Sequence, residues 1–110
     1  MGRVIELTSF EQFNKIKGMM KYVVIDMYAK WCMPCKQIAP HYEKMYADYE
    51  ARDDVVFLKC DVDQEMFNLL QVEVMSIPTF VIYRAGVPVD KVLGGDLEEL
   101  RATIDKIIQV

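Results

Sequence analysis

Cysteine and histidine are scarce in this chain of 110 residues, which contains three cysteines and one histidine. So few cysteines, in an odd number, argue against the disulfide-rich scaffold of small secreted proteins and favour a reducing compartment, so we expect a cytoplasmic location. A structural zinc ion needs four ligands, whereas the chain offers one Cys-X-X-Cys pair, at Cys32 and Cys35, and otherwise a single cysteine and a single histidine. We therefore expect no bound metal.

Long apolar runs and clusters of basic residues are also missing. No uninterrupted apolar stretch approaches the roughly 20 residues of a membrane-spanning helix, and residues 1–10 carry no apolar run of the length found in secretory signal peptides. Thirteen basic and seventeen acidic residues give a net charge of −4, with no Lys and Arg cluster interleaved with aromatic residues. We expect a soluble protein whose partners include neither membrane nor nucleic acid.

The length and the remaining composition are those of an ordinary folded domain. Hydrophobic residues make up 53% of the chain and charged residues 27%, which is typical of globular proteins. A chain of 110 residues is long enough for one modest core and too short for two. We therefore expect residues 1–110 to form a single domain.

Short β-rich runs alternate with helical patterns along the chain, which predicts an α/β fold with a central sheet. The predicted strands are residues 4–7, 22–28, 55–61, 80–84 and 87–93, and the predicted helices are residues 10–16, 32–49, 64–70 and 97–108. Because little more than Ala85 and Gly86 separates the last two strands, these strands must form an antiparallel hairpin. The pattern therefore predicts a mixed five-stranded sheet flanked by four helices.

An acidic residue follows directly on the apolar run of the second predicted strand. Residues 23–25 are all β-branched and apolar, as in a strand that helices cover on both faces, and Asp26 comes next. Burial disfavours the charged form of a carboxyl group and raises its pKa. Asp26 is therefore a candidate proton donor or acceptor near neutral pH.

Cys32 and Cys35 lie where this strand ends and a helix is predicted to begin. A thiolate at Cys32 would be stabilised by the free N–H groups and the dipole of the first helical turn, which makes Cys32 the natural nucleophile. Cys35 lies within bridging distance and deeper, as a resolving thiol would. Pro34 is tolerated in a first turn. A purely structural disulfide is disfavoured because so short a loop removes little entropy from the unfolded chain.

The chain resembles the thioredoxins over essentially its whole length. The residues that carry the resemblance are Asp26, the run Trp31-Cys32-Met33-Pro34-Cys35-Lys36, Pro40, Asp61-Val62-Asp63, Ile77-Pro78-Thr79 and Gly94. Cys-X-X-Cys alone is a weak signal, but with Trp31 before it and Ile-Pro-Thr at the start of a later strand it is highly specific. The resemblance implies the thioredoxin fold.

The resemblance also implies the residues of the active site. The catalytic group would be Cys32, Cys35, Asp26 and Pro78, and the substrate-binding group would be Trp31, Met33, Pro34, Ile77, Thr79 and Gly94. Pro78 would be a cis proline that faces the cysteines, a geometry that X-Pro bonds adopt at low cost. The backbone beside it would pair with an extended substrate segment. Asp26 would lie beneath Cys35 and assist its deprotonation, with Lys59 close by.

The activity implied by the resemblance is the reduction of protein disulfides by dithiol–disulfide exchange, as part of cell redox homeostasis. No cofactor would be bound, and the electrons would come from NADPH through a partner thioredoxin reductase. The substrates would be proteins with disulfides, such as peroxiredoxins, and the protein would act as a monomer.

The sequence departs from the family pattern at Met33, where thioredoxins usually carry Gly. This long apolar side chain at the rim of the site could adapt to varied substrates or obstruct the reductase, and it puts the redox potential in question. A thiol oxidase or isomerase of the same fold, and a redox-gated interaction protein, therefore remain as alternatives. Pro34, in place of the His of oxidising relatives, favours a reductant. Met75 is either a groove residue or an ordinary exposed loop residue. Cys60 ends an apolar strand, and a free cysteine in such a place is more often a buried, inert thiol than a regulatory one.

Overall fold

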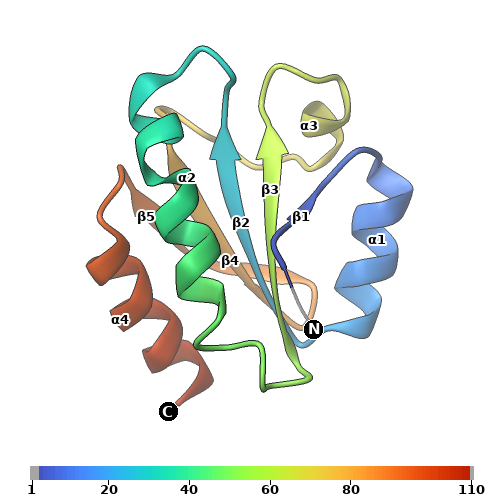
Figure 1. Ribbon diagram of the computed structural model, residues 1–110. Helices are drawn as coiled ribbons and strands as arrows, with labels where there is room; N and C mark the ends of the chain where they lie inside the picture. Colours follow the sequence, from blue (N-terminus) through green and yellow to red (C-terminus); the bar gives the residue numbers. More distant parts are fainter. Residues whose placement is uncertain (1–2, 110) are drawn as a thin grey trace.

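The computed structural model describes residues 3–109 as one sheet with helices on both of its faces (Figure 1). The strands are β1 (Ile5–Glu6), β2 (Tyr22–Tyr28), β3 (Val55–Asp61), β4 (Thr79–Arg84) and β5 (Val87–Leu93), and the helices are α1 (Phe10–Met19), α2 (Met33–Tyr46), α3 (Met66–Leu69) and α4 (Leu97–Ile108). The predicted fold, a mixed five-stranded sheet flanked by four helices, is confirmed.

The strands lie in the order β1-β3-β2-β4-β5, with β1, β3 and β2 parallel and β4 antiparallel to both of its neighbours. β2 is therefore the central strand, and its Asp26 is paired with Lys59 of β3 and Phe80 of β4. β4 and β5 form the predicted hairpin, at whose turn Ala85 and Gly86 have φ angles of 51° and 82°. Two residues with positive φ match the twist of the flanking strands.

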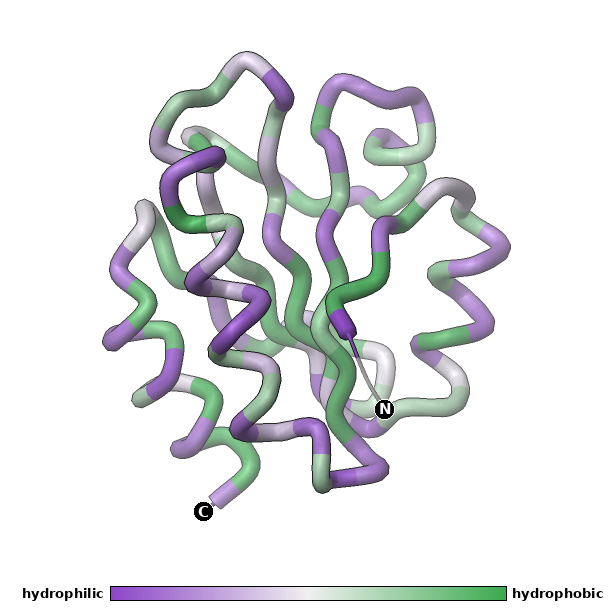
Figure 2. Tube along the Cα trace, viewed as in Figure 1, coloured by the Kyte–Doolittle hydropathy of each residue, from purple (hydrophilic) through white to green (hydrophobic). Residues whose placement is uncertain are grey.

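Alternate side chains of the sheet enter two cores on its opposite faces. In β2, Val24 belongs to the core beneath α2 and α4, whereas Val23 and Ile25 belong to the core beneath α1 and α3. Figure 2 shows hydrophobic residues concentrated in the central strands, while hydrophobic and hydrophilic residues alternate along α1 and α4. Burial on both faces explains the apolar run of β2. The same alternation places Asp26 on the face that α2 covers.

The helix that carries the cysteines is shorter than its sequence pattern predicts. α2 begins at Met33 rather than Cys32 and ends at Tyr46 rather than Tyr49. The Tyr49 N–H donates to the Tyr46 carbonyl at 2.9 Å, which is the hydrogen bond of a tighter turn. The Tyr49 ring is nevertheless buried against Phe57, so the apolar spacing continues beyond the end of the helix.

The predicted helix over residues 64–70 is reduced to the four residues of α3. Hydrogen bonds on either side of it join residues three apart rather than four, so the flanking backbone forms turns. α1 is longer than predicted and ends at Met19 rather than at residue 16. Within residues 3–109, no helix combines the length and the apolar character needed to cross a membrane.

Candidate active site

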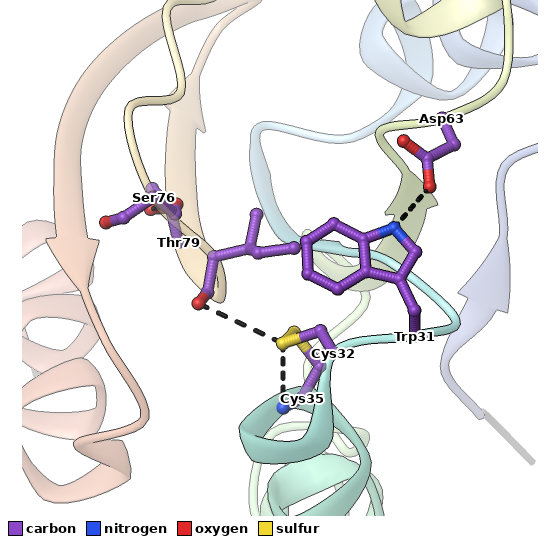
Figure 3. Close-up of a disulfide and its surroundings, with 7 residues drawn as sticks. Trp31, Cys32, Cys35, Asp63, Ser76 and Thr79 are labelled. Atoms are coloured by element: carbon purple, nitrogen blue, oxygen red, sulfur yellow. Dashed lines mark hydrogen bonds between the residues drawn. A yellow bond between two sulfur atoms is a disulfide. The ribbon is translucent and has the colours of Figure 1, made fainter.

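Cys32 and Cys35 lie at the junction of β2 and α2, at the upper edge of the sheet in Figure 1. Cys32 is the N-cap of α2, and its sulfur accepts a hydrogen bond from the Cys35 N–H at 3.2 Å. The two residues form a disulfide with their Cα atoms 5.3 Å apart (Figure 3). Pro34 lies in the first turn, where its missing N–H breaks no helical bond. In the dithiol form, the same N–H and the helix dipole would stabilise a Cys32 thiolate.

The two sulfur atoms have different surroundings. Both cysteines are buried in the disulfide form, so overall exposure does not distinguish the nucleophile from the resolving thiol. The Cys32 sulfur lies 3.9 Å from the carbonyl oxygen of Ile77, in the loop before β4. Cys35 instead lines a cavity of about 250 Å³ together with Asp26 and Lys59. Cys32 therefore lies against a surface loop, whereas Cys35 lines the same cavity as the Asp26 carboxyl group.

The loop before β4 contains the predicted cis proline, since the Ile77–Pro78 peptide bond is cis. The carbonyl of the buried Pro78 accepts a hydrogen bond from the Gly94 N–H at 2.9 Å. Gly94 has a φ of 79°, a backbone conformation that glycine adopts without a steric penalty. The structure thus brings Ile77, Pro78 and Gly94 together from two separate segments, with the Ile77 carbonyl directed at Cys32.

A largely apolar groove of about 490 Å³ opens beside the disulfide. It is lined by Trp31, Val62, Phe67, Val74, Met75, Ser76 and Ile77. The exposed Trp31 ring is oriented by its N–H, which donates to the Asp63 carboxylate at 2.8 Å (Figure 3). Met75, for which the sequence left two readings open, belongs to the groove. Met33 and Pro34 are exposed next to Cys32.

The side chain of Thr79 does not contribute to this groove, in contrast to its predicted place in the substrate-binding group. It is fully buried, and its hydroxyl donates to the Ser76 carbonyl at 2.6 Å. Thr79 begins β4 and is paired with Met27 and Leu93, so its side chain points into the protein. Its hydroxyl fixes the loop that carries Pro78.

Asp26 is buried as predicted. Burial, which disfavours the carboxylate, raises the pKa of Asp26 to about 7, while the Lys59 ammonium opposes this rise and the Glu6 carboxylate adds to it. The Oδ1 atom of Asp26 has no hydrogen-bond partner within residues 3–109. A carboxyl group with this pKa exchanges protons readily near neutral pH, and it shares its cavity with Cys35.

Polar side chains cluster beside Asp26, and of these Lys59 was predicted from the sequence but Glu6 and Tyr28 were not. Glu6 of β1 accepts a hydrogen bond from the Tyr28 hydroxyl at 2.7 Å, and the Lys59 ammonium lies 3.9 Å from the same Glu6 oxygen, Oε1. The register explains the cluster, because Lys59 of β3 is paired with Glu6 on one side and with Asp26 on the other. Only the strand order, which the sequence pattern does not reveal, makes Glu6 a neighbour of this site.

The remaining cysteine and the histidine take no part in the site. Cys60 is fully buried in β3 with its sulfur 3.7 Å from the Met66 sulfur. Burial raises the pKa of the Cys60 thiol to about 12, so little thiolate is present at neutral pH. His41 is exposed on α2. Across residues 3–109, no three or more His, Cys, Asp or Glu side chains gather closely enough to hold a metal ion.

Comparisons with known proteins agree with this geometry. The family model for thioredoxin matches residues 3–106. The chain is 42% identical over 98 residues to a thioredoxin of Malassezia sympodialis, a match that covers 89% of this chain and 92% of that protein. It is 39% identical over 104 residues to a thioredoxin of Staphylococcus aureus, with 94% and 96% covered. The solved structure of Plasmodium falciparum thioredoxin superimposes with a TM-score of 0.83 at 37% identity, covering 94% of this chain and 98% of that one.

The match to the family model runs from β1 into α4 and therefore covers the disulfide, the cis proline and the buried acid together. The likeness extends beyond the fold, because the identity to each of these relatives exceeds a third of the aligned residues. Cysteines that form and break a disulfide at a helix N-terminus exchange two electrons with other disulfides. The chain belongs to the thioredoxin family and is a thiol-disulfide oxidoreductase that reduces protein disulfides.

Proposed function

We propose that Cys32 is the attacking thiol and Cys35 the resolving thiol of a cytoplasmic protein-disulfide reductant. The different surroundings of the two sulfur atoms support this assignment: Cys32 lies against the Ile77 carbonyl at the surface loop, while Cys35 shares a cavity with Asp26. A substrate disulfide approaches from the side of the loop, and the proton of the second thiol leaves on the side of the carboxylate.

The reaction proceeds by two exchanges of sulfur–sulfur bonds. The Cys32 thiolate attacks one sulfur of the substrate disulfide, the substrate bond breaks, and the departing substrate thiolate takes up a proton. Cys35 then loses its proton to Asp26 and attacks the Cys32 sulfur of the mixed disulfide. The second substrate sulfur leaves as a thiolate and takes up a proton, Asp26 gives up the proton that it received from Cys35, and the Cys32–Cys35 disulfide remains. The substrate has gained two electrons and two protons, and the enzyme has lost them.

Asp26 is the proton acceptor in this scheme because its pKa is raised to about 7 by burial. A general base acts best when its pKa lies near the working pH. The cavity that contains both Asp26 and Cys35 also contains Lys59, whose positive charge opposes the rise in the Asp26 pKa. The carboxylate form is therefore substantially populated at pH 7.

Substrate proteins bind across the apolar surface around Cys32. Trp31 precedes the cysteine in sequence, Met33 and Pro34 follow it, and Ile77 lies against it through its carbonyl. The backbone beside Pro78 pairs with an extended substrate segment, and Gly94 leaves room for that segment because it carries no side chain. An apolar groove with a few fixed polar groups is typical of a binding site.

The electrons come from NADPH through a thioredoxin reductase, and peroxiredoxins are among the substrates. Two solved structures support such partners in relatives. One is the complex of ferredoxin:thioredoxin reductase with thioredoxin f2, which contains a chain 34% identical to this one. The other concerns thiol resolving in a yeast mitochondrial 1-Cys peroxiredoxin via glutathione and thioredoxin systems. We further propose that the protein acts as a monomer in the cytoplasm, which cell fractionation and sedimentation test.

Replacing the resolving thiol tests the assignment directly. Cys35→Ser leaves the first exchange possible and blocks the second, so we expect mixed disulfides to accumulate through Cys32. The measurement is non-reducing electrophoresis and mass spectrometry after incubation with a protein disulfide such as insulin. The matched control is Cys32→Ser, which should trap nothing. Equal trapping by both variants, or trapping by Cys32→Ser alone, contradicts the assignment.

A thiol oxidase or isomerase of the same fold is the second candidate, and the exposed Met33 between the cysteines is the observation that favours it. The midpoint potential of the Cys32–Cys35 couple separates the two. A value near about −270 mV is that of a thioredoxin-type reductant, whereas a value near about −180 mV is that of an isomerase. To measure this value, the protein is equilibrated in dithiothreitol buffers of graded redox potential and its free thiols are alkylated. Mass spectrometry then gives the fraction of protein in the dithiol form at each potential. A switched binding protein would show neither turnover nor a change in substrate thiols.

A further inference from the structure

Methionine is unusually abundant in this chain, with eight residues, and those in the described part divide sharply by exposure. Met27, Met45 and Met66 are buried in the two cores, and Met20 is partly buried. Three others are exposed to solvent: Met19 at 71%, Met33 at 59% and Met75 at 82%. Met19 ends α1, whereas Met33 and Met75 lie at the active site.

Met33 and Met75 border the path by which a substrate reaches Cys32. Met33 is the first residue of α2 and follows Cys32 directly. Met75 lines the apolar groove with Trp31 and Ile77, and the Ile77 carbonyl lies 3.9 Å from the Cys32 sulfur. Both thioethers therefore offer flexible, polarisable contact surface to any protein that brings a disulfide to Cys32.

We propose that Met33 and Met75 form an oxidation site at which hydroperoxides convert both thioethers to sulfoxides and thereby weaken the docking of protein substrates. In each event the O–O bond of the hydroperoxide breaks, one oxygen bonds to the methionine sulfur, and the other leaves as water when the oxidant is hydrogen peroxide or as an alcohol when it is an organic hydroperoxide. The sulfur loses two electrons and the peroxide gains them. A sulfoxide is polar and chiral, so it disrupts an apolar contact surface. The inference rests on the proposed function, because it assumes that substrates dock over this surface.

The cysteines do not compete for the oxidant when the protein is in its disulfide form. Cys32 and Cys35 are bonded to one another and buried. Cys60 is fully buried in β3, and burial raises the pKa of its thiol, so it presents little of the thiolate that reacts with peroxides. Exposed methionines are then the oxidisable sulfur atoms that a peroxide meets first.

The first measurement identifies the oxidised residues. The disulfide form is treated with hydrogen peroxide, and the sulfoxide fraction of each methionine is followed by peptide mass spectrometry. We expect Met33 and Met75 to be oxidised as fast as Met19, and well before Met27, Met45 and Met66. Oxidation of Met33 or Met75 at the slow rate of the buried residues overturns the proposal.

The second measurement compares two substrates of different size after treatment. Insulin must dock on the surface around Cys32, whereas 5,5′-dithiobis(2-nitrobenzoic acid) needs little more than access to the sulfur. We expect oxidation to lower the initial rate of insulin reduction about tenfold, as disturbing an apolar contact does, and to leave the rate with the small disulfide unchanged. An unchanged insulin rate, or an equal loss with both substrates, overturns the proposal.

Two variants assign the effect, each compared with its own untreated sample. The double variant Met33→Leu/Met75→Leu carries no oxidisable sulfur at the site and should keep its insulin rate after peroxide. Met19→Leu removes an exposed methionine elsewhere and should lose as much as the wild type. If the double variant loses as much as the wild type, the proposal is wrong. If untreated protein reduces neither substrate, the proposed function fails instead, so the two failures are distinguished.

Discussion

The residue with the least favourable surroundings in the site is Asp26, whose carboxyl group lies inside the fold. Burial raises its pKa from the ordinary value of 3.8 to about 7, so the folded protein holds a proton there that the unfolded chain has released. Below pH 3.8 both states are protonated and burial carries no titration penalty. As the pH rises toward 7, the folded state loses stability relative to the unfolded state, and above pH 7 the full penalty applies.

Asp26→Asn should therefore stabilise the protein, and more so at higher pH. We expect the gain in unfolding free energy over the wild type to widen by about 2–3 kcal/mol between pH 5 and pH 8. Urea unfolding of the disulfide form at several pH values measures this gain. The control is Asp53→Asn, an exposed carboxylate, which should show no such widening. A gain that is constant across this pH range would mean that Asp26 does not titrate there.

At the scale of elements, the shortest strand contributes a charged residue to the site. β1 has only two residues, yet its pairing with β3 sets Glu6 beside Lys59, and Tyr28 at the end of β2 donates to the same Glu6 carboxylate. Lys59 thus lies between the carboxyl groups of Asp26 and Glu6, and its ammonium group forms an ion pair with Glu6. This arrangement limits how far Lys59 stabilises the ionised form of Asp26.

Glu6→Gln should lower the pKa of Asp26. Two effects act in the same direction, because the variant removes a negative charge that raises this pKa and releases Lys59, which lowers it. We expect a decrease of about half a unit to one unit. Carbon-13 NMR titration of labelled aspartate carboxyl groups measures it, and the pH profile of the resolving step should move the same way.

Glu98→Gln on α4 is the matched control for this variant, because it removes an exposed carboxylate from a helix outside the Asp26 cavity. Tyr28→Phe should shift the Asp26 pKa less than Glu6→Gln does, since it removes only the hydrogen bond to Glu6 and no charge. An Asp26 pKa that stays the same in Glu6→Gln contradicts the role assigned to β1.

At the scale of the whole molecule, a single sheet separates two cores and joins them through shared strands. Phe57 contacts the rings of Tyr42, Tyr46 and Tyr49 on one face, while Leu58, the next residue of β3, enters the opposite core. If either core unfolds, the strands that it shares with the other core lose the packing on one of their faces. The active site draws on both, since α2 and the loop after α3 meet at Cys32.

Truncations on either face should therefore weaken the whole molecule rather than one layer. We expect Leu100→Ala on the buried face of α4 and Leu58→Ala on β3, in the opposite core, each to lower the unfolding free energy by about 2–5 kcal/mol. The midpoints followed by Trp31 fluorescence and by far-ultraviolet circular dichroism should coincide in both variants, as in a two-state transition. Separate midpoints in either variant would show that the layers unfold independently.

The sequence by itself determined the elements and the chemistry of this protein. Alternating strand and helix patterns predicted the layered fold, and the two residues at the hairpin turn made β4 and β5 antiparallel. The Cys-X-X-Cys pair before a helix, Asp26 after an apolar run and the Ile-Pro-Thr segment pointed to disulfide exchange. These features are local, because periodicity, turn length and residue type act over a few neighbouring positions.

The tertiary structure alone decided which distant segments meet. The strand order placed Glu6 beside Lys59, and the loop before β4 set the Ile77 carbonyl against Cys32 and Met75 into the groove. It also turned the Thr79 side chain inward, away from the substrate surface. Contacts of this kind depend on how strands pair and helices cover them, and one sequence pattern is compatible with several such arrangements until the cores are packed.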